Sequence, residues 1–370
     1  MTPMEPARIA LLAGDGIGVE VCDAVRAVAD ALQQRLPVCA LQWQALPAGA
    51  GHYRDHGQAL PAATLSACEQ ADAIFLGAMG LPEIRYPDGT EISPQLDLRE
   101  HFDLYAGVRP IRSLAGIPRV LADTRAADID LVLVREQTEG LFFDRRGTRV
   151  DEQGASDTLR ITAEGAHRIS RYAFELARHR RSPRDRAQVT LVDKANGLGS
   201  MAYFRARFLE IAEGYADIDH DCAYIDATAL NLVRKPWAFD VMVTENQFGD
   251  ILSDLCAALI GGMGLAPSAD IGDRHAMFQP AHGSAPDIAG RGIANPTAAI
   301  LSAAMMLDWL GLDERRAGMR QGAALISAAV DHAFASGACL PGEFGGHSGT
   351  AEITAAVVAG VRELPLPGNR

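Results

Sequence analysis

Short runs of apolar, often β-branched residues recur along the chain, and each ends at a turn former or a polar residue. Such runs are typical of buried β-strands. The clearest of them are residues 8–13, 73–77, 130–134, 188–193 and 239–244. Helical patterns lie between them, and alternating strands and helices are typical of α/β proteins. The pattern therefore predicts an α/β fold.

Apolar residues at helical spacing predict the helices. They fall at 19–32, 161–178, 201–212, 248–259, 297–310 and 351–362. Turn formers are dense over residues 280–296, which predicts a shaped loop. Proline, serine, aspartate and glycine also meet at 267–272, and a loop is predicted there as well.

Composition limits the classes of protein to consider. A length of 370 residues suits two domains, and 48% hydrophobic residues predict a large core. No apolar run approaches a membrane span, and the first residues lack a signal-peptide pattern. A net charge of −13 argues against nucleic acid or a membrane as partner. The six cysteines show no metal-binding spacing, so reduced thiols and a cytoplasmic location are predicted.

The first strand runs into the glycine turn Gly14–Gly18, GDGIG. Glycines permit a tight turn and close approach of the backbone to a ligand. The pattern is not the GxGxxG fingerprint, and no acidic residue follows at the place where that fingerprint needs one. A Rossmann fold is therefore not predicted, and a simple turn is the alternative to a ligand loop.

Three acidic residues are candidates for metal binding. Asp250 and Asp254 are four residues apart and so share one face of the predicted helix 248–259. Their repulsion grows on burial, and a divalent cation would reverse it, since hard cations prefer carboxylate oxygens. Asp226 lies among apolar residues, where an acid is expected to be paired or to bind metal. A solvated acidic face is the alternative.

Basic residues suggest an anionic substrate. Arg99, Arg109 and Arg135 carry the planar fork that binds carboxylates, and together they suit a dicarboxylate. Arg109 precedes a proline and is predicted to lie in extended chain at the end of an element. Lys194 directly follows a strand, a position suited to acid–base work. Surface arginines and a lysine on an exposed turn are the alternatives.

These segments occur in one chain and in one order: GDGIG, RExTEG, VDKAN, VTENQFGDILSD and HGSAPDIAG…GIANP. Together they resemble the isocitrate/3-isopropylmalate dehydrogenase family of metal-dependent β-decarboxylating dehydrogenases, nearest to an isopropylmalate dehydrogenase-like member. The resemblance implies a two-domain α/β fold with a non-Rossmann dinucleotide site. Residues 1–104 and 261–370 would form the cofactor-binding domain, and 105–260 a central domain with the interface of a homodimer. The subunits would share their active sites.

The resemblance also assigns roles by position. The three arginines would bind substrate together with Ser93, Gln95 and Leu96. Lys194 and Asp226 would be catalytic, and Mg²⁺ or Mn²⁺ would be held by Asp226, Asp250 and Asp254, shared between subunits. K⁺ is a further expected ion. The cofactor would be held by His282, Gly283, Ser284, Ala285, Asp287, Ile288 and Asn295.

The expected reaction is oxidative decarboxylation of a (2R)-malate derivative, most simply 3-isopropylmalate. D-malate or tartrate is an alternative substrate, and a catalytically weakened paralogue that only binds nucleotide and dicarboxylate is an alternative function. NAD is the expected cofactor, because Asp287 and Ile288 stand where NADP-using relatives carry Lys-Tyr. A carboxylate accepts hydrogen bonds from ribose hydroxyls but repels a 2′-phosphate.

The chain departs from the family pattern at three places that bear on chemistry. Phe142 stands where a tyrosine would protonate the enolate, and phenylalanine has no proton to give. Hydride transfer is expected to survive while reprotonation is slowed or passes to another group. Gln279 replaces a glutamate, a loss of one charge. Gln95 and Leu96 replace a leucine pair, and an unpaired buried Gln95 would cost about 1–3 kcal/mol, which favours a partly polar substrate.

Overall fold

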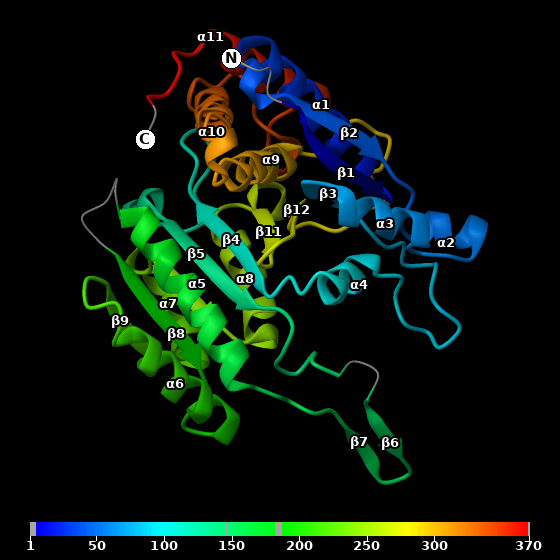
Figure 1. The fold of residues 1–370 in the computed structure, drawn as a ribbon. Helices are drawn as coiled ribbons and strands as arrows, with labels where there is room; N and C mark the ends of the chain where they lie inside the picture. Colours follow the sequence, from blue (N-terminus) through cyan, green and yellow to red (C-terminus); the bar gives the residue numbers. More distant parts are fainter. Residues whose placement is uncertain (1–4, 145–146, 182–186, 369–370) are drawn as a thin grey trace.

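A ten-stranded sheet forms the centre of the computed structural model, which describes residues 5–144, 147–181 and 187–368 (Figure 1). The strand order is β2-β1-β3-β12-β11-β4-β5-β10-β8-β9. The strands are β1 (Ala7–Gly14), β2 (Leu41–Ala45), β3 (Ala73–Ala78), β4 (Ala106–Arg112), β5 (Asp130–Glu136), β8 (Gln188–Asp193), β9 (Asp219–Tyr224), β10 (Val241–Thr244), β11 (Pro267–Ile271) and β12 (Ala276–Pro280). A separate hairpin of β6 (Arg149–Asp151) and β7 (Gly154–Ser156) projects from the body (Figure 1).

The sheet is parallel at both ends and antiparallel in the middle, where β12, β11, β4 and β5 pair. The strands from the two ends of the chain occupy one half, and those from its central part occupy the other. The halves meet where β11 pairs with β4. The expected α/β fold is confirmed, while the division into two domains stays a prediction.

Helices cover both halves of the sheet (Figure 1). They are α1 (Gly18–Arg35), α2 (Ala50–His56), α3 (Ala62–Gln70), α4 (Pro94–His101), α5 (Ala163–Arg181), α6 (Gly199–Ala212), α7 (Ile225–Arg234), α8 (Asn246–Leu259), α9 (Thr297–Leu310), α10 (Met319–Ala335) and α11 (Thr350–Glu363). Helices α1, α9, α10 and α11 pack together beside one half, and α5 packs with α6 on the other. Among the described residues, no helix is long and apolar enough to cross a membrane.

The predicted loop at residues 267–272 is wrong, because Pro267–Ile271 forms the fully buried strand β11. Its turn-forming composition misled the prediction. Proline is tolerated at the first residue of a strand, and the buried charge of Asp270 is met by distant arginines.

The predicted place of Arg109 at the end of an element is also wrong, since it lies inside β4. The paired residues of β11 extend along β4 only from Ala106 to Val108. Pro110 therefore lies beyond that ladder, where the missing N–H of a proline costs no hydrogen bond with β11.

Candidate active site

The central strands separate a polar face of the sheet from an apolar one. Successive side chains of a strand point to opposite faces. In β4, Arg109 therefore points away from Val108 and Pro110, and in β11 Asp270 points away from Ala269. Each face borders one cavity.

The cavity on the polar face has a volume of about 210 Å³. Strands β3, β4, β5, β11 and β12 and helices α4 and α8 contribute to its wall. The polar side chains that line it are Gln95, Arg99, Arg109, Arg135, Asp250, Ser253, Asp254, Ser268, Gln279 and His282.

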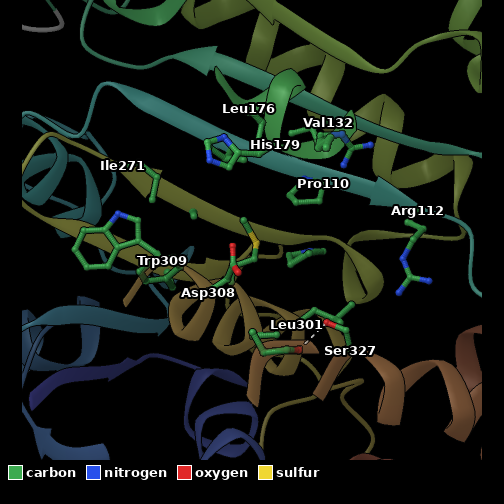
Figure 2. A pocket seen from close by; sticks show the side chains of 18 of the residues that line it. Pro110, Arg112, Val132, Leu176, His179, Ile271, Leu301, Asp308, Trp309 and Ser327 are labelled. Atoms are coloured by element: carbon green, nitrogen blue, oxygen red, sulfur yellow. Dashed lines mark hydrogen bonds between the residues drawn. The ribbon is translucent and has the colours of Figure 1, made fainter. Parts of the chain in front are cut away.

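The cavity on the apolar face is larger, about 560 Å³, and lies between α5, the central strands and α9. Figure 2 shows Pro110, Val132, Leu176 and Trp309 around it. Its charged residues have partners of their own. Arg112 is 2.7 Å from Asp331, and Asp308 is 3.1 Å from Arg320. The smaller cavity is the candidate site, because it gathers convergent charged groups.

A buried carboxylate lies at the base of the arginine cluster. Asp270 is fully buried and accepts a hydrogen bond from Nε of Arg99 at 2.8 Å and one from Nη1 of Arg109 at 3.2 Å. The side-chain amides of Gln137 and Gln279 donate to the same carboxylate at 2.9 and 2.7 Å. Burial alone would raise the pKa of Asp270, but Arg99 and Arg109 hold it below its usual value.

Arg135 is fixed by helix α8. Its Nε and Nη2 donate to Oδ1 of Asn246 at 2.9 and 2.6 Å, and its Nη1 donates to Asp250 at 2.5 Å. Gly249 makes this approach possible, because a Cβ there would lie 2.6 Å from the Arg135 side chain. Burial lowers the pKa of Arg135 to about 10, so the guanidinium stays charged at neutral pH.

The two aspartates of α8 lie on one helical face beside Arg135. The helix begins one residue after Glu245, whose carboxylate caps it by accepting from the N–H groups of Gln247 and Phe248. Burial raises the pKa of Asp254, and the neighbouring Asp250 adds to the effect. Two carboxylates at this spacing fit a hard divalent cation, which would relieve their repulsion.

Lys194 and Asp226 form a separate pair. Nζ of Lys194 donates to Asp226 at 2.9 Å, and this contact lowers the pKa of the carboxyl group. Over the described part of the chain, no three His, Cys, Asp or Glu side chains gather closely enough to hold a metal. The three predicted metal ligands are therefore not assembled within one chain, and their sharing between subunits stays a prediction.

The predicted cofactor loop follows β12 and closes over the first glycine turn. The N–H of Ile17 donates to the carbonyl oxygen of Ser284 at 2.8 Å, and Oγ of Ser284 donates to the carbonyl of Gly80. Asp287 is exposed in this loop. Oδ1 of Asn295 caps the start of α9, so this side chain also has a structural role.

Three buried polar atoms of the smaller cavity lack a hydrogen-bond partner among the described residues. They are Oε1 of Gln95, Oγ of Ser268 and Nε2 of His282. A buried polar atom without a partner costs about 1–3 kcal/mol. The cavity therefore suits a ligand that is itself polar, such as a hydroxy acid or a nicotinamide.

Comparison with known proteins gives the family. The model of the family described as isocitrate/isopropylmalate dehydrogenase matches residues 8–357. The chain belongs to this family. It is therefore a β-decarboxylating dehydrogenase, an oxidoreductase.

Individual relatives differ in the substrates that their names carry. The 3-isopropylmalate dehydrogenase of Pseudoalteromonas translucida is 40% identical over 95% of this chain and 98% of its own. The homoisocitrate dehydrogenase of Methanocaldococcus jannaschii is 41% identical over 83% of this chain and 84% of its own. The crystal structure of isocitrate dehydrogenase from Methylococcus capsulatus matches with a TM-score of 0.84 and 38% identity, covering 96% and 100% of the two chains.

Within this dehydrogenase, the structure brings only some of the predicted residues together. Residues that line the candidate site are Gln95, Arg99, Arg109, Arg135, Asp250, Asp254, His282 and Gly283. Residues that lie outside its lining are Ser93, Leu96, Phe142, Lys194, Asp226, Ser284, Ala285, Asp287, Ile288 and Asn295. Ser284 instead accepts from Ile17 in the first glycine turn. The Phe142 ring lies 6.0 Å from the Arg135 guanidinium and is 40% exposed.

Sequence reasoning missed Asp270 and Asn246, which contact the arginines, and Gln137, which donates to Asp270. Asn246 was visible only as the residue that ends the preceding strand. For Asp270, the available signal in the sequence was a charged residue inside a segment of β-strand length.

Proposed function

We propose that the chain oxidatively decarboxylates a (2R)-malate derivative, most simply 3-isopropylmalate, as an NAD-dependent and Mg²⁺- or Mn²⁺-dependent homodimer. The observation that carries the proposal is the convergence of Arg99, Arg109 and Arg135 with Asp250 and Asp254 around one small cavity. Guanidinium groups suit the carboxylates of such a substrate, and the adjacent acids suit a cation beside them.

The roles of the residues follow from this arrangement. Arg135, held by Asn246 and Asp250, would orient one carboxylate close to the metal ligands. Asp226, Asp250 and Asp254 would hold the metal ion, which would supply polarisation of the C2 hydroxyl, and the loop from His282 would hold NAD, which would supply the hydride acceptor. Lys194 and Asp226, supplied by the second subunit, would take the hydroxyl proton.

Protonation of the enolate at C3 needs a donor other than the tyrosine of the family pattern. Phe142 carries no proton donor, so we propose that water or another group returns a proton to C3 after CO₂ leaves. The exposure of the Phe142 side chain supports access of water to that position.

A second substrate class has one specific observation in its favour. Oε1 of Gln95 is buried without a partner among the described residues. The 3-hydroxyl of tartrate would donate to it, whereas an isopropyl group would leave it unpaired at a cost of about 1–3 kcal/mol. Tartrate is therefore the second candidate, whereas D-malate, which has no 3-hydroxyl, would also leave this oxygen unpaired.

The test is to follow NADH and CO₂ in parallel with Mn²⁺ and K⁺ present. The substrates are 3-isopropylmalate, D-malate, tartrate, isocitrate and homoisocitrate. We expect NADH with matching CO₂ on 3-isopropylmalate. NADH without CO₂ would limit the reaction to oxidation, and binding of NAD without NADH formation from any substrate would favour the catalytically weakened paralogue.

A further inference from the structure

The residue at the base of the arginine cluster has no role in the reaction as described so far. Asp270 is fully buried, and its carboxylate contacts two of the three arginines that face the substrate. Burial of an isolated carboxylate is costly, and it is sustained here by two guanidinium groups and two amides. The pair of arginines therefore carries a built-in counter-charge before any substrate binds.

The two arginines contact Asp270 through different nitrogens. Arg99 donates to Asp270 through Nε, which leaves its terminal nitrogens for a carboxylate in the cavity. Arg109 donates through Nη1 and Nη2 to Oδ1 of Asp270 at 3.2 and 3.3 Å. Asp270 thus contacts both forks, and the backbone carbonyls of Val108 and Ala269 also accept from Nη1 of Arg109.

Gln279 and Gln137 complete the shell around this carboxylate. The amide of Gln279 donates to Oδ2 of Asp270 at 2.7 Å, so a glutamate there would bring two carboxylates together. Gln137 reaches the other oxygen across Gly107, where a Cβ would lie 1.8 Å from the Gln137 nitrogen. The carboxylate that the family pattern expects at position 279 is therefore replaced here by one at position 270, which lies beside Arg99 and Arg109.

We propose that Asp270 is a specificity-determining residue that works through Arg99 and Arg109. It holds the two guanidiniums in place and cancels part of their charge, so the site takes a substrate with two carboxylates in preference to one with three. The inference rests on the proposed function, since it refines which malates the site accepts. It predicts selection against malates whose C3 substituent is anionic.

The experiment measures binding without NAD, so that no turnover occurs. The two ligands are 3-isopropylmalate and isocitrate, which carry a neutral and an anionic C3 substituent, and Mg²⁺ is present. Calorimetry on the full-length dimer gives both dissociation constants. We expect the wild type to bind 3-isopropylmalate at least about tenfold more tightly than isocitrate, because the carboxylate of Asp270 repels the extra carboxylate of isocitrate.

Three variants decide the case. Asp270→Asn should reduce the preference for 3-isopropylmalate by about tenfold, and Gln279→Glu should weaken both ligands, isocitrate more than 3-isopropylmalate. The double variant Asp270→Asn/Gln279→Glu returns one carboxylate to the cluster and should recover the wild-type preference. A thermal unfolding curve for each variant shows that the fold is intact, and Gln279→Glu keeps the test decisive if Asp270→Asn does not fold.

An unchanged preference in Asp270→Asn would overturn the inference, as would a double variant no better than the singles. Gln279→Glu binding both ligands as tightly as the wild type would also overturn it. If the two dissociation constants differ as expected but no substrate yields NADH, the inference on Asp270 holds and the proposed function fails. If the wild type binds neither ligand, both fail together.

Discussion

Two of the cavities among the described residues lie on opposite faces of the same strands and differ in size and in lining. The larger, of about 560 Å³, is lined mainly by apolar side chains, and its charged residues pair with near neighbours. The smaller, of about 210 Å³, gathers three arginines and two aspartates. Strand alternation produces the contrast, because consecutive residues such as Val108 and Arg109 serve different cavities.

The difference shows why the candidate site is assigned by the convergence of charged side chains and not by cavity size. An apolar cavity between α5 and α9 follows from packing two layers of helices against a sheet. Buried arginines cost free energy unless something holds them, and in the smaller cavity Asp270, Asn246 and Asp250 do so. Burial lowers the pKa of Arg109, and Asp270 counters this effect.

The largest expected effect comes from the proposed metal ligands. Asp250→Asn removes a carboxylate beside Arg135 and should lower kcat/KM by about 10³-fold, because a bound cation supplies several kcal/mol. Mn²⁺-dependent NADH formation measures it. Asp308→Asn, which lies in the apolar cavity, is the matched control and should change kcat/KM less than about twofold. Full activity in Asp250→Asn would refute the metal assignment.

A pair of equal substitutions compares the two faces directly. Arg135→Lys loses the fork that joins Asn246 to Asp250 and should raise KM about thirtyfold, since one ammonium cannot replace a bidentate contact. Arg112→Lys alters the apolar cavity and should leave KM within about twofold. Equal KM values in the two variants would mean that the contrast between the faces has no functional meaning.

A substitution at Phe142, beside Arg135, tests whether an added proton donor increases turnover. Its ring is near Arg135 and 40% exposed, so a hydroxyl can be added without burial. Phe142→Tyr should restore a proton donor and raise kcat several-fold, up to about tenfold. Phe143→Tyr, at a neighbouring side chain that is 41% exposed, is the control. Identical kcat values for the two variants would show that protonation at C3 does not limit turnover.

The smallest effect concerns stability. Burial raises the pKa of Glu136 to about 7 from a usual value of 4.5. The folded protein therefore holds this proton where the unfolded chain has lost it, and stability should fall as pH rises from about 4.5 to 7. Glu136→Gln should flatten that part of the pH dependence in chemical denaturation. An unchanged slope would show that Glu136 titrates normally.

Much of the site was predictable because its residues stand in local sequence patterns. Asp250 and Asp254 are four apart on a helix, and Arg135 ends a strand of unmistakable apolar character. Asp270 was not predictable in this way. Its partners Arg99 and Gln137 lie 171 and 133 positions away, and its neighbours are turn formers. Only the pairing of β11 with β4 shows that this aspartate is buried among arginines.

The most direct test of where the chemistry lies is a crystal structure of the protein with 3-isopropylmalate and Mn²⁺ bound. We predict that the substrate carboxylates contact Arg99, Arg109 and Arg135 while Asp250 and Asp254 hold the metal. Substrate bound in the apolar cavity between α5 and α9 would contradict the assignment of the active site to the polar face.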